Sequence, residues 1–176
     1  MSNLKTVPAA AVAREAEATS AQYLTFTLQD EPYALGILHI KEIIEFNEMT
    51  QVPLMPDFVR GVINLRGRVV PVIDLLARFG RGATQVYRRT AIVIVEVENR
   101  DGELEAALQD VGIMVDAVNE VVEICQADIE PPPMFGANLR TDFISGMARR
   151  GGKFTIILDM SQTLSIAEMA SLGGMA

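Results

Sequence analysis

Residues 58–75 read Phe-Val-Arg-Gly-Val-Ile-Asn-Leu-Arg-Gly-Arg-Val-Val-Pro-Val-Ile-Asp-Leu. Gly67 separates two apolar runs, which predicts two strands joined by a tight turn that needs a residue at positive φ. Pro56 favours a short helix over Asp57–Arg60 ahead of these strands. Asp74 is expected to cap another short helix that ends near Phe79.

The same pattern recurs 85 residues later, without a gap, over residues 143–160. A second match lies in the same order, because residues 40–46 (Ile-Lys-Glu-Ile-Ile-Glu-Phe) resemble residues 118–124 (Val-Asn-Glu-Val-Val-Glu-Ile). The β-branched content of residues 40–46 favours a strand over a helix. We interpret the matches as a duplicated β unit, first at about 33–75 and again at about 111–160, with exchange of strands between the units left open.

Many short strands and little long helix indicate a mainly β class. Small closed barrels remove exposed sheet edges, and two such barrels packed together fit a chain of 176 residues. Around them we expect a flexible tail over residues 1–20 and a solvated acidic hairpin at about 98–110. A closing helix is expected over Ser161–Leu172, with residues 166–176 forming its end and a tail.

Composition excludes several classes of function. A net charge of −8 and a pI of about 4.7 make the chain a poor general binder of phosphate backbones. One cysteine and one histidine exclude a disulfide framework and a Cys-cluster or poly-His metal centre. No apolar run approaches the roughly 18 residues that span a bilayer, so we expect a cytoplasmic protein.

Catalytic motifs are also missing from the sequence. The glycines of residues 146–153 are one residue out of register with a phosphate-binding loop, and Phe154 stands where that loop needs Ser or Thr. We interpret His39 as a structural strand residue on a polar face and Cys125 as a small buried hydrophobe. The sequence therefore predicts no enzyme and no cofactor.

Charge is unevenly distributed along the chain. Residues 56–90 contain seven arginines and two aspartates, whereas residues 96–130 contain eleven acidic residues and one arginine. Ordinary solvated turns would explain this, and so would two surfaces for two protein partners. A third alternative is a small-barrel nucleic-acid-binding module that uses the Arg-rich 56–90 segment, although interleaved aromatic residues are missing there.

The string from Asn64 to Leu75 strongly resembles the CheW family of chemotaxis coupling proteins. The similarity covers roughly residues 21–165 and includes residues 33–37, 40–43, 61–63, 112–116 and 156–159. It implies two packed SH3-like five-stranded β-barrels, without catalysis or cofactors.

The resemblance also implies partners. Such proteins are scaffold adaptors that bridge the cytoplasmic tips of chemoreceptors (methyl-accepting chemotaxis proteins) to the regulatory domain of the histidine kinase CheA in signalling arrays. They are therefore membrane-associated only through the receptors. Partner-contact segments of the family match two sets of residues here, which are Ile40, Glu42 and Ile43, and then Asn64, Leu65, Arg66 and Gly67 in a loop beside the groove between the barrels. Arg66 is expected at the surface.

Overall fold

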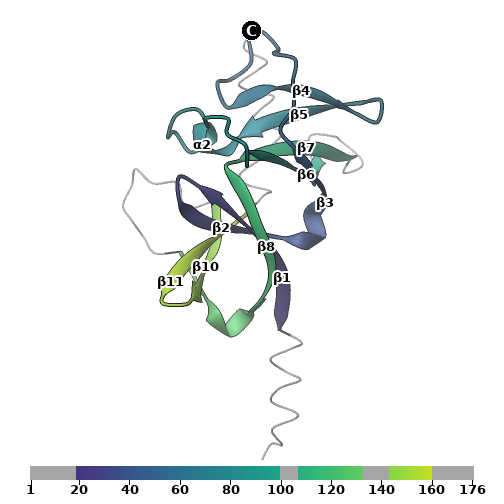
Figure 1. The fold of residues 1–176 in the computed structure, drawn as a ribbon. Helices are drawn as coiled ribbons and strands as arrows, with labels where there is room; N and C mark the ends of the chain where they lie inside the picture. The colour runs from purple at the N-terminus through teal and green to yellow at the C-terminus, as the bar shows by residue number, and fades with distance from the viewer. Residues whose placement is uncertain (1–18, 100–106, 133–142, 160–176) are drawn as a thin grey trace, which may run out of the picture.

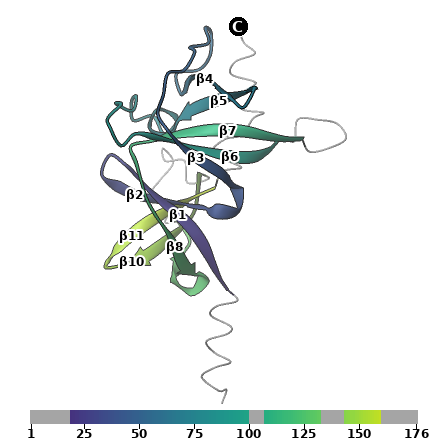
Figure 2. The ribbon, with the colours of Figure 1, turned by 45° about the vertical axis from the view of Figure 1, so that its right-hand side comes forward.

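The computed structural model describes residues 19–99, 107–132 and 143–159, and these form two β-sheets packed against each other (Figures 1 and 2). The six-stranded sheet, barrel 1, has the order β8 (Ala117–Cys125), β1 (Ser20–Leu28), β2 (Glu31–Gly36), β11 (Lys153–Leu158), β10 (Ile144–Arg150), β9 (Ile129–Glu130). The five-stranded sheet, barrel 2, has the order β3 (Ile40–Glu45), β6 (Ala91–Asn99), β7 (Ala107–Val115), β5 (Arg68–Asp74), β4 (Val59–Leu65). Within the described residues, three short helices connect the strands: η1 (Ile37–His39), η2 (Gln126–Asp128) and α2 (Leu75–Arg78). The predicted mainly β class with two packed SH3-like barrels is confirmed. Barrel 1 has six strands instead of the expected five, since η2 separates β9 from β8.

The two halves of the chain exchange strands. Strands β1 and β2 belong to barrel 1, but β3, β4 and β5, which follow them in the chain, belong to barrel 2. In the second half β6 and β7 join barrel 2, and β8 to β11 return to barrel 1. Residues 33–75 and 111–160 therefore do not each form a barrel alone, because each barrel is completed by strands from the other half.

The strand registers show whether the segments that match in sequence also have equivalent positions in the two barrels. The β4–β5 and β10–β11 hairpins have the same irregularity at the same place, between Val59 and Gly61 and between Ile144 and Gly146. Strands β3 and β8 each carry a bulge against the neighbouring strand, at Lys41 and at Asn119. Both sequence matches thus fall on equivalent elements of the two barrels.

The core has three layers. The largest cluster lies between the sheets and includes Phe26, Leu35, Val93 and Ile113. Two smaller clusters lie within barrel 2, around Ile92, Ile94 and Met114, and within barrel 1, around Ala34 and Ile157. Alternate residues of β6 face different layers, which explains why residues 91–95 are all apolar and buried.

Two local expectations had different outcomes. Asp74 caps α2 as predicted, since its carboxylate accepts hydrogen bonds from the backbone N–H groups of Leu76 and Ala77. The helix predicted over Asp57–Arg60 is wrong: a turn closed by the hydrogen bond from Val59 N to Pro56 O leads into β4. The β-branched residues after Val59 pair with β5, and this pairing overrides the local helix signal.

Other expectations lie outside the described residues. They are most of the tail at 1–20, the tip of the acidic hairpin at 100–106, and the closing helix at 161–172. The flanks of that hairpin are described and pair as β6 and β7 up to Asn99 and Ala107. Asp110 within them is buried, so the expectation of a solvated hairpin is wrong at that residue. Among the described helices, none has the length and hydropathy that crossing a membrane requires.

Candidate functional site

The Asn64–Gly67 segment forms the tight turn that the sequence predicted. Leu65 and Arg68 pair across the hairpin, and the two residues between them have positive φ, 55° at Arg66 and 83° at Gly67. The Asn64 side-chain oxygen accepts a hydrogen bond of 2.9 Å from the Gly67 N–H. The turn is thereby fixed in the type I′ geometry, which fits the right-handed twist of the flanking strands.

Arg66 lies at the surface, as expected, and binds Glu42 of β3. Its guanidinium donates two hydrogen bonds to the carboxylate, at 2.7 and 3.3 Å. The Arg66 side chain is 76% exposed and the Glu42 side chain 24%. The structure therefore joins the two segments that the resemblance implied as partner contacts. An exposed pair of this kind contributes only about 0–1 kcal/mol to stability.

Lys41, next to Glu42 on β3, and Arg68, which follows the turn, form a second group of ion pairs, and the two groups together are called the charged corner below. Its members are Lys41, Glu42, Arg66, Arg68, Glu96 and Asp110. The Lys41 ammonium lies 3.1 Å from Asp110 and 3.4 Å from Glu96, and Arg68 lies 3.4 Å from Asp110. The hydrogen bond to Asp110 raises the pKa of Lys41 above its ordinary value.

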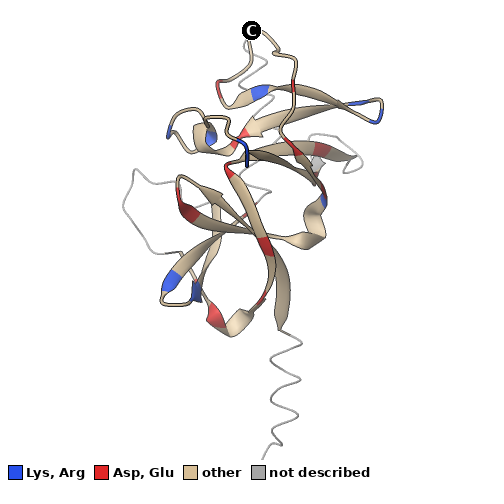
Figure 3. Ribbon diagram, in the orientation of Figure 1, with Lys and Arg blue, Asp and Glu red and all other residues tan. Residues whose placement is uncertain are grey.

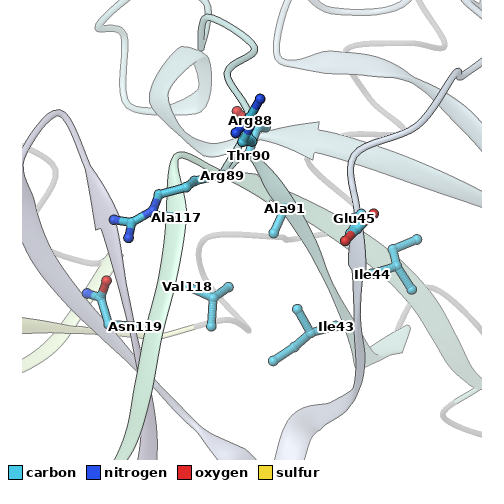
Figure 4. A pocket seen from close by; sticks show the side chains of 10 residues that line it. All are labelled: Ile43, Ile44, Glu45, Arg88, Arg89, Thr90, Ala91, Ala117, Val118 and Asn119. Atoms are coloured by element: carbon cyan, nitrogen blue, oxygen red, sulfur yellow. The ribbon is translucent and has the colours of Figure 1, made fainter.

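A groove of about 520 Å³ lies between the barrels (Figure 4). Ile43 of β3 and Val118 of β8 face each other across it, with Glu45 at one side and Arg89 at the other. None of the residues that line this groove belongs to the Asn64–Gly67 turn. Asn64 instead lines a neighbouring hollow that shares Ile44 and Glu45 with the groove, so the turn lies near the groove without forming its wall.

The remaining expected contact residues differ in accessibility. Ile43 is 44% exposed. Ile40 is half-buried and packs against the core between the sheets, so it supports β3 rather than presenting a free surface. Leu65 is half-buried and packs against the cluster within barrel 2.

The loop after α2, residues 80–89, is held in place by a buried cluster of hydrogen bonds that the sequence analysis did not predict. The Asp74 carboxylate accepts hydrogen bonds from the Thr84 N–H and hydroxyl, both at 2.7 Å, and from Arg60 at 3.1 Å. Arg60 also donates to the Thr84 carbonyl. Thr84 is buried within an otherwise exposed loop that brings Arg88 and Arg89 to the inter-barrel groove.

Four of the seven arginines of residues 56–90 are engaged within the molecule. Arg60, Arg66 and Arg68 form ion pairs, and Arg78 stacks between the rings of Phe58 and Phe143 at 4.9 and 4.7 Å. Basic residues are interspersed with acidic ones over both barrels (Figure 3). Within residues 56–90, these four arginines already have partners in the fold, so nothing here favours the nucleic-acid alternative.

No catalytic cluster stands out among the described residues. His39 lies in η1 and is exposed, so it is not the strand residue that the sequence suggested. Cys125 is half-buried beside Thr19. Across residues 19–99, 107–132 and 143–159 there is no group of three or more His, Cys, Asp or Glu side chains suited to a metal ion.

Comparison with known proteins adds the family context. Residues 22–168 match the family model described as a CheW-like domain. The chain is similar to the chemotaxis protein CheW of Klebsiella aerogenes, at 32% identity over 160 residues and 91% of each chain, and to that of Treponema pallidum, at 29% identity and 88% of each chain. It also resembles the crystal structure of the scaffolding protein TtCheW from Thermoanaerobacter tengcongensis, with a TM-score of 0.68 and 37% identity over 80% of this chain and 84% of that chain.

Proposed function

The chain belongs to the CheW-like family, and from this premise we propose that it is a non-catalytic scaffold adaptor. It couples the cytoplasmic tips of chemoreceptors to the regulatory domain of a CheA-type histidine kinase in signalling arrays. It acts in the cytoplasm and reaches the membrane only through the receptors.

The observation that carries this proposal is the presence of two surfaces along β3 that share no residue. One is the turn surface, formed by Glu42, Asn64, Arg66 and Gly67. The other is the inter-barrel groove with Ile43 on its wall. An adaptor must hold two partners at once, so it needs two surfaces that do not overlap.

The chemistry of the two surfaces differs in a useful way. Arg66 presents a planar fork that binds carboxylates with two hydrogen bonds, and arginine is enriched among residues that dominate binding energy. The groove instead offers apolar side chains between charged ends, which suits an amphipathic segment. We assign one surface to each partner.

Isothermal titration with the kinase regulatory domain and with a receptor-tip fragment tests this proposal. Arg66→Glu should weaken binding of one partner by about 2–5 kcal/mol, which is a factor of about 30 to several thousand in the dissociation constant. The reason is that the variant places a carboxylate beside Glu42 and removes an interfacial charge. Ile43→Glu should weaken the other partner. The melting temperature should stay near wild type for both variants, since both side chains are exposed.

Lys153→Glu is the matched control. Lys153 is exposed in the β10–β11 hairpin, at the position that corresponds to Arg68 of β5. Its charge reversal should leave both affinities unchanged. If both test variants lose binding of the same partner, the turn and the groove form a single binding surface. If both variants bind with wild-type affinity, β3 and the turn do not bind partners.

A further inference from the structure

The internal repeat allows the charged corner to be compared with its counterpart in barrel 1. The registers around the two bulges and the two hairpins give the corresponding positions. They pair Lys41 with Asn119, Glu42 with Glu120, Glu96 with Thr27, Asp110 with Pro32, Arg66 with Gly151, and Arg68 with Lys153. In barrel 1, Asn119 and Thr27 are joined by a neutral hydrogen bond of 3.0 Å.

The buried carboxylate of Asp110 has no counterpart in barrel 1, where Pro32 takes its place. The Asp110 side chain is 8% exposed, whereas those of Lys41 and Arg68, which bind it, are 38% and 66% exposed. Asp110 pairs directly across the β6–β7 ladder with Glu96. Like charges in that arrangement repel, and the Lys41 ammonium lies between the two carboxylates.

The tip of the β4–β5 hairpin is thus attached to its neighbours at two points. Arg66 binds Glu42 on β3 where solvent reaches the pair, and Arg68 binds the buried carboxylate of Asp110 on β7. An exposed ion pair can exchange partners at little cost. Lys41 binds the buried carboxylate of Asp110 even when Arg68 moves, so this carboxylate stays where the Arg68 guanidinium can return to it.

We infer that Asp110 is a positioning residue, which holds the β4–β5 tip in place through Arg68. The Arg66 guanidinium can then exchange the Glu42 carboxylate for a carboxylate of the bound partner. This inference rests on the proposed function, because it assumes that the turn surface meets a partner. Gly151 and Gly152 in the corresponding turn of barrel 1 offer no such fork. The partner is therefore expected to recognise barrel 2 and to dock in one orientation.

Two measurements test this inference, one without a partner and one with it. Amide hydrogen exchange by NMR reports on the Gly67 N–H, which is bonded to Asn64 within the turn. Asp110→Asn and Arg68→Gln should each raise its exchange rate by about tenfold or more, with unchanged exchange at Val93 and Ile113 in the core. The control, Lys153→Gln, should leave the Gly67 rate unchanged.

Titration with the kinase regulatory domain and the receptor-tip fragment gives the second readout. Asp110→Asn should weaken the partner that depends on Arg66 by about tenfold in the otherwise wild-type chain. It should cause little further loss in an Arg66→Ala background, because the two residues act through one contact. A purely structural role would give the same loss in both backgrounds.

The exchange rates and the affinities together distinguish the positioning role of Asp110 from the binding role of the turn. Wild-type exchange at Gly67 in both Asp110→Asn and Arg68→Gln overturns the inference. Faster exchange at the turn, together with unchanged affinity in Asp110→Asn and in Arg66→Ala, supports the positioning role and overturns the binding role proposed for the turn. If Asp110→Asn fails to fold, the exposed Arg68→Gln variant provides the same test.

Discussion

Thr84→Val tests whether one buried hydrogen bond fastens the loop that carries the groove arginines. The Thr84 hydroxyl donates to the Asp74 carboxylate at 2.7 Å, and both residues are buried. Valine has nearly the same shape but no hydroxyl. The remaining backbone donors, from Leu76, Ala77 and Thr84 itself, stay on the carboxylate, so the variant should fold.

The size of the effect follows from the charge on the acceptor. A hydrogen bond to a charged group is worth about 1.5–3 kcal/mol, and 1 kcal/mol shifts the melting temperature of a chain this long by about 2–4 °C. Thr84→Val should therefore lower the melting temperature by about 3–12 °C. Asp74→Asn should cost more, about 3–5 kcal/mol, because it leaves Arg60 without its carboxylate and turns an amide toward the Thr84 N–H.

Thermal unfolding followed by circular dichroism measures these shifts, and titration with the kinase regulatory domain and with the receptor-tip fragment shows which partner depends on the groove. Thr84→Ser keeps the hydroxyl and should retain most of the stability and affinity. A melting temperature for Thr84→Val within 1 °C of wild type would refute the reasoning, since the buried carboxylate would then not depend on this donor.

Three further predictions concern the fold. Cleavage after Gly82 should give two fragments that are unfolded alone and recover β-sheet circular dichroism when mixed, because each barrel needs strands from both halves; a fragment that folds alone would contradict the exchange. Burial raises the pKa of Tyr33 above 10.0, and the hydrogen bond to Asp110 raises the pKa of Lys41 above 10.5, so both groups hold their protons more tightly in the folded state. The free energy of unfolding, measured with urea, should therefore fall as the pH rises above about 10, and it should fall less steeply in Tyr33→Phe. Gly112→Ala would place a Cβ 2.8 Å from a methyl of Ile92 and should cost about 1–3 kcal/mol in the same urea assay, whereas an unchanged midpoint would show that the core accommodates the methyl group.

Much of the local structure could be predicted from the sequence, because its causes lie within a few residues. Gly67 between two apolar runs fixes a turn with positive φ, and Asp74 next to an apolar pair fixes a helix cap. The repeat at an offset of 85 residues indicated two related hairpins, and both form. The exposed position of Arg66 followed from its place in the turn.

The site could be predicted only in part. The resemblance named Glu42 and Arg66 separately, but nothing in their spacing showed that they bind each other across 24 residues. Asp110 lay within an acidic segment and gave no signal of its own, since its partners are 42 and 69 residues away. Thr84 was likewise one polar residue in a polar loop.

The sequence by itself determined which segments form strands, where the chain turns, and that the β unit occurs twice. Only the tertiary structure decided that the halves exchange strands, that residues 57–60 turn into β4 instead of forming a helix, and that Arg66 binds Glu42 of β3. Turn and cap signals are local because backbone sterics and nearby hydrogen bonds create them. Strand partners and ion pairs depend on which distant surfaces are buried together, and that is settled only when the whole core forms.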